Sequence, residues 1–304
     1  MKGLILVTGS NGMIGSRFVE LTPRKNFLHL PSEVELDITN AKEVKDIISS
    51  YKFSAVIHFA AFTDVGGAEK ERGDKNGVCW QVNVEGTKNL VDAINPNVTH
   101  FIHISTDMVF SGSSEDPGPY DEEQKPEAYP DKLTWYGWTK AEGERYVSEK
   151  LGNNASIVRL IYPVRASFEG KLDYLRRPLQ LFDEGKLYPL FSDQQVSVSF
   201  IDEIATALEK IIDDNHRGVF HISSRDTTTP HEIVSYMLLK TRGLEKAIDS
   251  TTLGEFLKKT GQTVVRYPKY GGLSVNRTEE KLGLRFSSWR EIVDKMVAQG
   301  LGKK

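Results

Sequence analysis

Apolar runs of strand length alternate with helical patterns through the first half of the chain, and this alternation limits the fold more than any other feature. The runs expected to be strands lie at 4–7, 27–30, 55–59, 101–104 and 157–160, and the helical patterns between them lie at 14–21, 41–50, 85–94 and 141–151. Strands joined by helices pair in parallel, and the helices then cover both faces of the sheet. The pattern predicts an α/β fold with a doubly wound parallel sheet.

The regular alternation ends about halfway along the chain. A length of 304 residues suits one large domain or two modest ones. We expect a nucleotide-binding domain over 1–165 and a smaller, mostly helical C-terminal substrate domain over 166–304. A strand-like run at 218–222 indicates that about 193–225 returns to the first domain. The segment 111–130 is rich in Pro, Gly, Asp and Glu and is expected to be a floppy loop.

Charge and composition exclude several classes of function. The 39 basic and 42 acidic residues give a formal net charge of −3, with no dominant run of either sign. We therefore expect neither nucleic acid nor an anionic membrane as a partner. No apolar stretch approaches the roughly 18 residues that span a bilayer. Cys79 is the only cysteine, so no internal disulfide can form, which fits a reducing cytoplasm. No His, Cys and Asp cluster at metal spacing appears, so we expect no metal site.

A glycine-rich turn joins the first expected strand to the first expected helix. Gly9, Gly12 and Gly15 are spaced three apart there. In this context glycines permit a tight turn and a close approach of backbone to a pyrophosphate, which the free N–H groups of the helix start can bind. A plain turn is the alternative. Coming directly after a first strand, the turn favours a Rossmann-type dinucleotide site.

The end of the second expected strand bears on the choice of dinucleotide. In NAD-binding proteins an acidic residue at this position binds the ribose 2′-hydroxyl, but here the strand ends at Leu30 without one. Three basic side chains are available for the 2′-phosphate of NADP: Arg17, Arg24 and Lys25. We therefore favour NADP(H) as the cofactor. NAD(H) is the alternative, with Glu33 or Glu35 as the ribose partner.

Three polar residues, Ser105, Thr106 and Asp107, interrupt an otherwise apolar stretch at 101–110. One interpretation is a turn, because these side chains bond readily to nearby backbone. The other is chemistry, because ligands of open α/β sheets bind at the carboxyl ends of the strands. Downstream, Tyr136 and Lys140 lie four apart and share a helix face. An ammonium near a phenol lowers its pKa toward the working range. The combination favours chemistry.

Several longer segments carry a resemblance to a known family. They are VTGSNGMIG, LDIT, VIHFAAFTDV, VNVEGTKNL, HISTDMVFSG, YGWTKAEGE, FSDQQVSVSFIDEIATAL and GVFHISS, which extend over most of residues 1–225, and a weaker match, SVNRTEEKLGLRFSSWREIV, near the end. Together they resemble the extended short-chain dehydrogenase/reductase superfamily, and within it most of all the dTDP-4-dehydrorhamnose reductases.

The resemblance implies a set of site residues. Thr106, Tyr136 and Lys140 would form a catalytic triad. Cofactor contacts would come from Gly9, Asn11, Gly12, Met13, Ile14, Gly15, Asp37, Ile38, Phe59, Ala60, Ala61, Thr63, Asn83, Lys140 and Tyr162. Substrate contacts would come from Thr63, Val65, Thr106, Asp107, Phe110 and Tyr136. Simpler roles remain open for some of these: Asp37 could form a cap with Thr39, Asn83 could cap the helix after it, and Ala60 and Ala61 could be core.

The activity that the resemblance implies is NAD(P)H-dependent reduction of the 4-keto group of a nucleotide-linked 6-deoxy sugar. Tyr136 would deliver the proton and Thr106 would polarise the carbonyl. Related 4,6-dehydratases carry a glutamate at the position of Met108, so dehydration is not expected. The alternatives are a nucleotide-sugar 4-epimerase and a non-catalytic NADP-binding regulatory subunit. The resemblance also allows a homodimer.

The chain departs from the family around the expected substrate pocket, which leaves the exact sugar nucleotide open. Gly66 and Gly67 replace the usual residues before Ala68, and the loops within 66–82 and 111–130 are lengthened. Three tryptophans near these loops could stack on a base or sugar, or could simply pack against other side chains: Trp80, Trp135 and Trp138.

Overall fold

The computed structural model describes residues 3–263, 265 and 267–303. The chain divides into two compact units. We call unit 1 the residues up to 110 together with 125–159 and 204–220. We call unit 2 the remaining segments, 111–124, 160–203 and the part from 221 onward. The chain therefore passes between the units several times.

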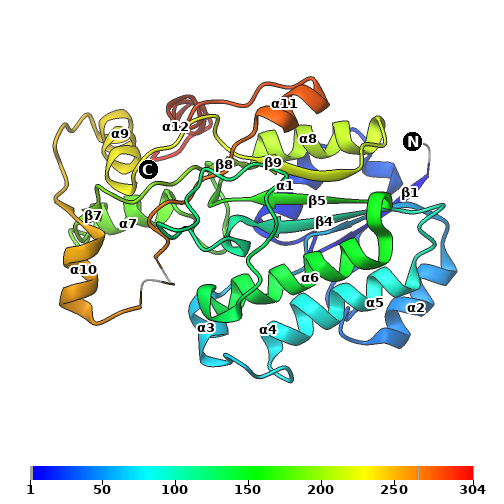
Figure 1. The fold of residues 1–304 in the computed structure, drawn as a ribbon. Coiled ribbons are helices and arrows are strands. Elements are labelled where there is room, and N and C mark those ends of the chain that lie inside the picture. Colours follow the sequence, from blue (N-terminus) through cyan, green and yellow to red (C-terminus); the bar gives the residue numbers. More distant parts are fainter. Residues whose placement is uncertain (1–2, 264, 266, 304) are drawn as a thin grey trace. The chain divides into compact units, whose positions relative to one another are not determined.

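A six-stranded sheet in the order β2-β1-β3-β4-β5-β9 forms the centre of the α/β part of the chain, most of which is unit 1 (Figure 1). Its pairs β1–β2, β1–β3 and β3–β4 are parallel. Because helices cover both faces, the inner strands are buried almost throughout, as their apolar sequences require. The strands are β1 (Leu4–Thr8), β2 (Leu28–His29), β3 (Phe53–His58), β4 (His100–Thr106), β5 (Ala155–Leu160) and β9 (Gly218–Ile222).

Helices lie on both faces of this sheet, which confirms the doubly wound α/β fold. Helices α2, α5 and α6 lie side by side on one face (Figure 1). On the other face an ion pair joins Arg24, just after α1, to Glu209 of α8. The helices of this layer structure are α1 (Met13–Leu21), α2 (Ala41–Ser50), α3 (Val65–Lys70), α4 (Val78–Trp80), α5 (Gly86–Ala93), α6 (Trp135–Leu151) and α8 (Ile201–Asp213).

The helix predicted over 85–94 begins earlier than the sequence pattern suggested. Helical structure starts at Val78 in α4, continues through a π-helical segment, η2 (Gln81–Glu85), and passes into α5. A π-helical turn adds one residue to the i→i+4 repeat and often occurs at functional sites. Asn83 lies within this turn, so its side chain leaves the helix in a direction that a regular α-helix would not provide.

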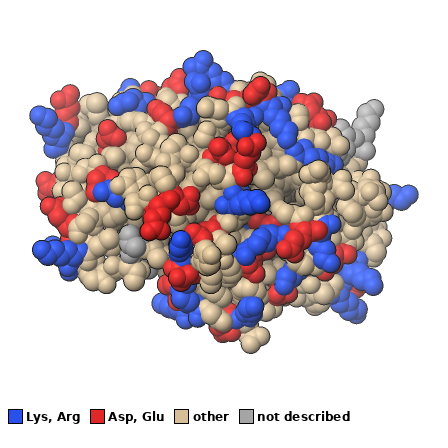
Figure 2. Space-filling view, viewed as in Figure 1, with Lys and Arg blue, Asp and Glu red and all other residues tan. Residues whose placement is uncertain are grey.

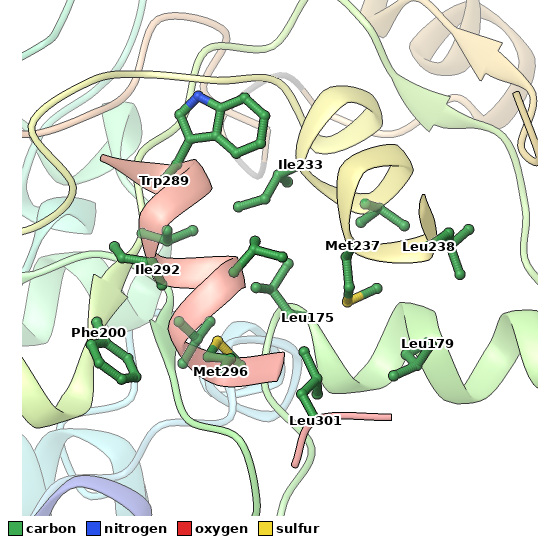
Figure 3. Close-up of a cluster of buried hydrophobic side chains, with 14 of the residues drawn as sticks. Leu175, Leu179, Phe200, Ile233, Met237, Leu238, Trp289, Ile292, Met296 and Leu301 are labelled. Carbon is green, nitrogen blue, oxygen red and sulfur yellow. The ribbon is translucent and has the colours of Figure 1, made fainter. Parts of the chain in front are cut away.

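Unit 2 is built mainly from helices around its own apolar core. Trp289, Ile292 and Met296 of one helix pack with Ile233 and Met237 of another (Figure 3). Its elements are β6 (Pro163–Val164), α7 (Arg176–Asp183), β7 (Leu190–Phe191), β8 (Ser199–Phe200), α9 (Pro230–Arg242), β10 (Ser250–Thr251), α10 (Leu253–Thr260), α11 (Asn276–Leu282) and α12 (Trp289–Ala298). The strands form two parallel pairs, β6–β8 and β7–β10.

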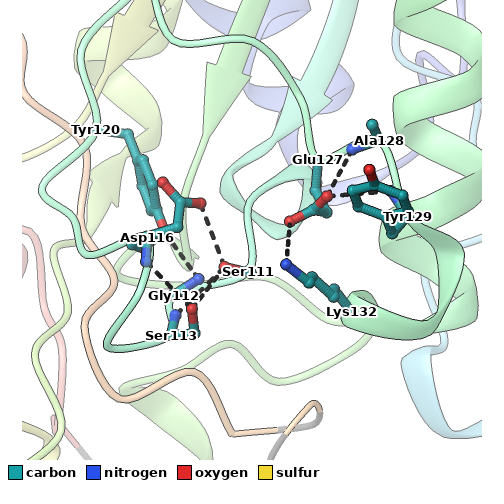
Figure 4. A network of polar contacts seen from close by, with 9 residues as sticks. All are labelled: Ser111, Gly112, Ser113, Asp116, Tyr120, Glu127, Ala128, Tyr129 and Lys132. Carbon is teal, nitrogen blue, oxygen red and sulfur yellow. Dashed lines mark hydrogen bonds and ion pairs between the residues drawn. The ribbon is translucent and has the colours of Figure 1, made fainter.

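The long segment after Thr106 is a loop, as expected, but it has fixed internal contacts. The buried Tyr120 phenol accepts a hydrogen bond from Gly112 N at 2.7 Å and donates one to Asp116 O at 2.5 Å (Figure 4). Separately, the Glu127 carboxylate accepts hydrogen bonds from the backbone N–H groups of residues 128 and 129 (Figure 4). Local side-chain bonds, together with backbone hydrogen bonds from the Tyr120 region to residues 270–274, order this segment.

Charged side chains of both signs are interspersed on the face drawn in Figure 2. This agrees with the near balance of 39 basic and 42 acidic residues. Within the described part of the chain, no helix has the length and apolar character needed to cross a bilayer.

Replacing Tyr120 with phenylalanine tests how much the loop contributes to stability. The change keeps the ring and deletes the hydroxyl, so the N–H of Gly112 loses its acceptor. We expect the free energy of unfolding in urea to fall by about 1–3 kcal/mol. Tyr129→Phe is the matched control, because the Tyr129 side chain is 61% exposed. Equal effects of the two substitutions would contradict the assigned contribution.

Candidate active site

The glycine turn between β1 and α1 closes too tightly for side chains. Gly9 has φ +68°, and a Cβ there would lie 2.6 Å from Ala60 N. A Cβ on Gly15 would overlap the carbonyl oxygen of Gly9. Gly12 precedes α1 without any side-chain cap, and the first turn of the helix holds no acidic residue. Uncapped N–H groups at the positive end of a helix dipole fit the pyrophosphate of a dinucleotide.

A chain of buried hydrogen bonds supports the strand ends beside this turn. Thr8 and His58 are in register on β1 and β3, with the Thr8 hydroxyl 2.8 Å from His58 Nδ1. His58 Nε2 lies 3.1 Å from the Thr87 hydroxyl, which itself donates to the carbonyl oxygen of Asn83. Because Thr87 donates onward, it accepts from Nε2–H. Burial lowers the pKa of His58 to about 3, so the ring is neutral at neutral pH and its Nδ1 accepts from Thr8.

Thr106 ends β4, and its hydroxyl is bonded locally. It accepts from Met108 N at 3.2 Å and donates to the Asp107 carboxylate at 3.1 Å. The interpretation as a turn is therefore correct for the backbone, which continues as a short 3₁₀ helix, η3 (Asp107–Val109). The same hydroxyl lies close enough to Tyr136 to act on its phenol, and its influence lowers the pKa of that group. The turn thus orients Thr106 beside the phenol, so the two interpretations do not exclude each other.

Helix α6 brings Tyr136 and Lys140 to this strand end. Its N-terminus is capped by the Thr134 hydroxyl, which accepts from Gly137 N at 3.1 Å, and by the Glu69 carboxylate of α3, which accepts from Trp135 N at 3.0 Å. Tyr136 is half-buried and Lys140 is buried. The Lys140 ammonium donates to the carbonyl oxygen of Ile104 on β4 at 2.8 Å. The helix start and the strand end are thus held together by polar contacts.

Gly137 permits α6 to lie against η3. A Cβ at this position would overlap the carbonyl oxygen of Met108, and that atom is backbone, which cannot move aside cheaply. The glycine follows Tyr136 directly, so the distance between the phenol and the Thr106 turn depends on it.

Burial dominates the electrostatics of the site. It raises the pKa of the Tyr136 phenol, with the nearby Asp107 carboxylate acting in the same direction and the Thr106 hydroxyl opposing it. This is opposite to the lowering by Lys140 that the sequence suggested. Burial also raises the pKa of Asp107 to about 7 and lowers that of Lys140 to about 8. In this structure the ammonium is directed to Ile104 O on β4.

Asn83 links the loop after β3 to helix α6. Its Oδ1 accepts from Phe62 N at 2.8 Å, and its Nδ2 donates to Phe62 O at 3.1 Å and to the Thr139 hydroxyl at 3.0 Å. Thr139 in turn donates to Tyr136 O at 2.8 Å, and the buried Cys79 thiol lies 3.5 Å from the Thr139 hydroxyl. Asn83 is therefore bonded to the loop backbone rather than capping a helix.

At the adenosine end the structure changes the interpretation of the basic residues. Arg24 lies beyond the C-terminus of α1, where its guanidinium contacts Glu209 at 2.8 Å and also pairs with Asp213, so it is already paired and not available for the 2′-phosphate of NADP. Asp37 is exposed and accepts from the N–H and hydroxyl of Thr39, while Ile38 is buried. Asp37 thus forms the local turn with Thr39 and is still exposed, so the predicted contact of Asp37 with the cofactor is compatible with this turn.

The remaining predicted contacts differ in exposure. In unit 1, Thr63 is exposed and Val65 begins α3, whereas Phe110 is buried with the Arg159 guanidinium 4.9 Å from its ring centre. In unit 2, Tyr162 has φ +39°, an unusual conformation for a bulky residue and one that often marks a functional site. The roles assigned to all the site residues stay predictions.

The tryptophans near the site are explained by packing. Trp80 and Trp135 stack on each other with ring centres 5.7 Å apart, and both are buried. Trp138 packs against the same cluster.

Sequence reasoning missed several residues that hold the site together. Glu69 caps helix α6, and His58 joins the ends of β1 and β3 through its contact with Thr8. His103 of β4 lies 3.4 Å from the Lys140 ammonium. The only signal was their position: both histidines interrupt apolar strands. Among the described residues, no group of three or more His, Cys, Asp or Glu side chains is arranged to hold a metal ion.

Comparisons with known proteins agree with this geometry. A family model described as RmlD substrate binding domain matches residues 1–301. The chain is 27% identical over 290 residues to a Haloferax volcanii protein named "Probable low-salt glycan biosynthesis reductase Agl14", covering 91% of each chain. It is 27% identical over 296 residues to dTDP-4-dehydrorhamnose reductase of Aggregatibacter actinomycetemcomitans, covering 94% of this chain and 95% of that one. A solved dTDP-4-dehydrorhamnose reductase from Bacillus anthracis, in complex with NADP, superimposes with a TM-score of 0.82 at 24% identity, covering 98% of this chain and 100% of that one.

Gly137→Ala tests the close approach of α6 to η3. The added methyl group would overlap Met108 O, so we expect the free energy of unfolding to fall by about 1–3 kcal/mol, the usual cost of overpacking. Gly254→Ala in α10 is the control, because nothing lies within 4 Å of a Cβ there. That change should be neutral or stabilising by up to about 1 kcal/mol. Similar losses in both variants, measured by urea unfolding, would contradict the steric explanation.

Proposed function

The chain belongs to the RmlD substrate-binding domain family, and from that membership we propose that it reduces the 4-keto group of a nucleotide-linked 6-deoxy sugar with NADPH. Its relatives include proteins named dTDP-4-dehydrorhamnose reductase, and one related structure holds NADP. The proposal treats Thr106, Tyr136 and Lys140 as the catalytic residues. It also treats unit 1 as the cofactor-binding part and unit 2 as the part that contributes to the sugar nucleotide site.

One observation carries the proposal: the Thr106 hydroxyl at the end of β4 is close enough to the Tyr136 phenol to influence its pKa, while Lys140 donates a hydrogen bond to the same strand. The glycine turn lies at the end of β1, which pairs with β3 next to β4 in the sheet. Carboxyl ends of parallel strands form one edge of the sheet, where open α/β folds bind their ligands. A proton donor and a dinucleotide cradle on one edge suit reduction of a carbonyl.

The proton chemistry follows from the state of the phenol. Because burial raises its pKa, Tyr136 is protonated at neutral pH and can donate to the oxygen of a carbonyl under reduction. The Thr106 hydroxyl can donate a second hydrogen bond to that oxygen if it exchanges Asp107 for the substrate. The nicotinamide, when bound, supplies the hydride that reaches the carbonyl carbon. Hydride and proton together convert C=O to CH–OH.

The groups proposed to hold the cofactor are those with suitable geometry. The backbone N–H groups at the start of α1 would bind the pyrophosphate, with Gly9 and Gly15 keeping the turn compact. The loop from Phe59 to Thr63, held by Asn83, would line the cofactor. Lys140 would bind the nicotinamide ribose. A cytoplasmic location and a homodimer, both expected from the sequence, remain predictions.

Tyr136→Phe tests the proton donor. The variant keeps the ring, so the fold and NADPH binding should survive, while turnover with a 4-keto-6-deoxy sugar nucleotide should fall by roughly 10²–10⁴-fold. Turnover is followed by loss of NADPH absorbance and NADPH binding by fluorescence titration. Near-normal turnover in this variant would sink the proposed mechanism.

Thr106 provides a matched pair of variants for the same assay. Thr106→Ser keeps the hydroxyl that bonds Met108 N, whereas Thr106→Val removes it at nearly constant shape. We expect the serine variant to retain most turnover and the valine variant to lose most of it. Equal turnover in the two variants would mean that the Thr106 hydroxyl is not needed for catalysis.

Cofactor preference is the second test. No acidic side chain follows Leu30 directly, and Glu35 is occupied by Ser32, whose N–H and hydroxyl both donate to its carboxylate at 2.8 Å. The dissociation constant measured by titration should therefore be at least tenfold lower for NADPH than for NADH, about 1.4 kcal/mol. Since Arg24 is paired elsewhere, Arg24→Gln should leave this ratio unchanged. A preference for NADH would point to Glu33 as a ribose ligand instead.

A further inference from the structure

A second buried histidine, His103, contacts the Lys140 side chain, and neither the proposed mechanism nor the sequence pattern explains it. The Lys140 ammonium lies 2.8 Å from Ile104 O and 3.4 Å from His103 Nε2. An ammonium has three hydrogens and no lone pair, so both neighbours must act as acceptors. Within the described part of the chain these are the two hydrogen-bond acceptors of the ammonium.

This contact fixes the protonation state of His103. Since Nε2 accepts from the ammonium, the ring proton must reside on Nδ1. Nδ1 is buried and has no hydrogen-bond partner among the residues that the structure describes. Burial and the positive charge of Lys140 hold the pKa of His103 well below its ordinary value. The ring is therefore neutral and directs its one acceptor at the lysine.

Neighbouring groups hold the imidazole in place. His103 is in register with His58 on the adjacent strand, and their ring centres are 5.5 Å apart. Gly143 of α6 also lies against the ring, since a Cβ there would be in van der Waals contact with His103 Nε2 at 3.5 Å. The contact with Lys140 is thus a fixed element of the strand–helix interface.

His103 shares a buried Nδ1 without a partner among the described residues with His100 on the same strand, but it directs Nε2 at the Lys140 ammonium, whereas His100 directs it at the Ser156 hydroxyl. Buried polar atoms in folded proteins are nearly always hydrogen bonded, and each exception needs an explanation. His103 leaves Nδ1 without a partner while Nε2 serves the ammonium. An apolar residue of similar size would avoid the cost of burying Nδ1 but would remove the acceptor.

We propose that His103 is a positioning residue for Lys140: its neutral imidazole accepts a hydrogen bond from the ammonium and thereby holds both the side chain and its charge at the end of β4. The consequence for activity rests on the proposed reductase function. The tautomer and the contact do not depend on it.

The charge of Lys140 needs support because the group is buried. Burial lowers its pKa to about 8, and the carboxylate of Glu144 and the thiol of Cys79 oppose this lowering. Glu144, one turn further along α6, is itself shared with Arg159 at 2.8 Å. Of the other titratable groups around the site, His58 is neutral, Tyr136 keeps its proton, and Asp107 titrates near neutrality. Loss of the imidazole acceptor therefore shifts the lysine titration toward lower pH.

The first experiment reads the tautomer in the intact protein without any assay of activity. Histidine labelled with ¹⁵N gives separate Nδ1 and Nε2 signals, and the signals of His103 among the seven histidines are assigned from their loss in His103→Gln. We expect His103 to be neutral with its proton on Nδ1 throughout the neutral pH range. A proton on Nε2, or a charged ring, would overturn the proposal, because the ammonium would then have no acceptor.

The second experiment compares pH profiles of kcat/KM for NADPH-dependent reduction of a 4-keto sugar nucleotide. In His103→Leu the alkaline limb should move to lower pH by about 0.5–1 unit, the equivalent of one lost hydrogen bond. His103→Gln places an amide oxygen near the position of Nε2 and should restore the limb. His100→Leu is the matched control, since His100 is buried on the same strand but bonds Ser156 at 2.7 Å.

The outcomes separate the proposal from a purely structural role. A loss of activity at every pH in both leucine variants, with no shift of the limb, would mean that His103 only packs. If the wild-type protein reduces no 4-keto sugar nucleotide, the reductase function fails, while the tautomer measurement still decides the contact between His103 and Lys140.

Discussion

The close approach of helix α6 to the end of strand β4 is the constraint on which the candidate site depends. Gly137 permits it, because a Cβ there would overlap Met108 O of η3 directly after β4, and Gly143 lets the same helix lie close to η2, since a Cβ there would be 3.1 Å from Asn83 O. A larger residue at either position would push the helix outward and separate Tyr136 from Thr106. Protein interiors pack densely and respond to the addition of a single methyl group. The position of the Tyr136 phenol therefore depends on the absence of a side chain at these two glycines.

Neutral polar groups, rather than a dense set of charges, support this geometry. The side chains of Asn83, Thr139 and Thr87 connect the loop after β3, helix α6 and the strand ends by hydrogen bonds. The Asn83 amide and the hydroxyls of Thr139 and Thr87 each donate to an acceptor in this network. Fully satisfied networks of this kind rigidify their surroundings. Lys140 is a buried cation whose acceptors, Ile104 O and His103, are neutral and whose charge is supported by the Glu144 carboxylate, so loss of one acceptor matters.

Sequence alone predicted the fold well, because it follows from local patterns, whereas the roles of the site residues stay predictions. The strand at 218–222 and the helix at 41–50 agree with the structure to the residue, since periodicity and flanking breaks define them. Other features depend on contacts between distant segments. Nothing local in the chain indicates that Glu69 caps α6, that Arg24 pairs with α8, or that burial outweighs Lys140 in setting the state of Tyr136. The π-helical turn at Asn83 was missed for a similar reason, because one inserted residue leaves the apolar spacing on either side nearly unchanged.

The burial of Cys79 has a practical consequence. It is the protein's single cysteine, its side chain has no exposed surface, and burial raises the pKa of its thiol. Reagents attack the thiolate, and a buried thiol with a raised pKa provides very little of it. A cysteine introduced on the surface would therefore react selectively with maleimide dyes or spin labels in the otherwise native protein. With one cysteine introduced into each unit, the spectroscopic distance between the two labels could then be measured. Cys79, which packs against Thr139, would not have to be removed first.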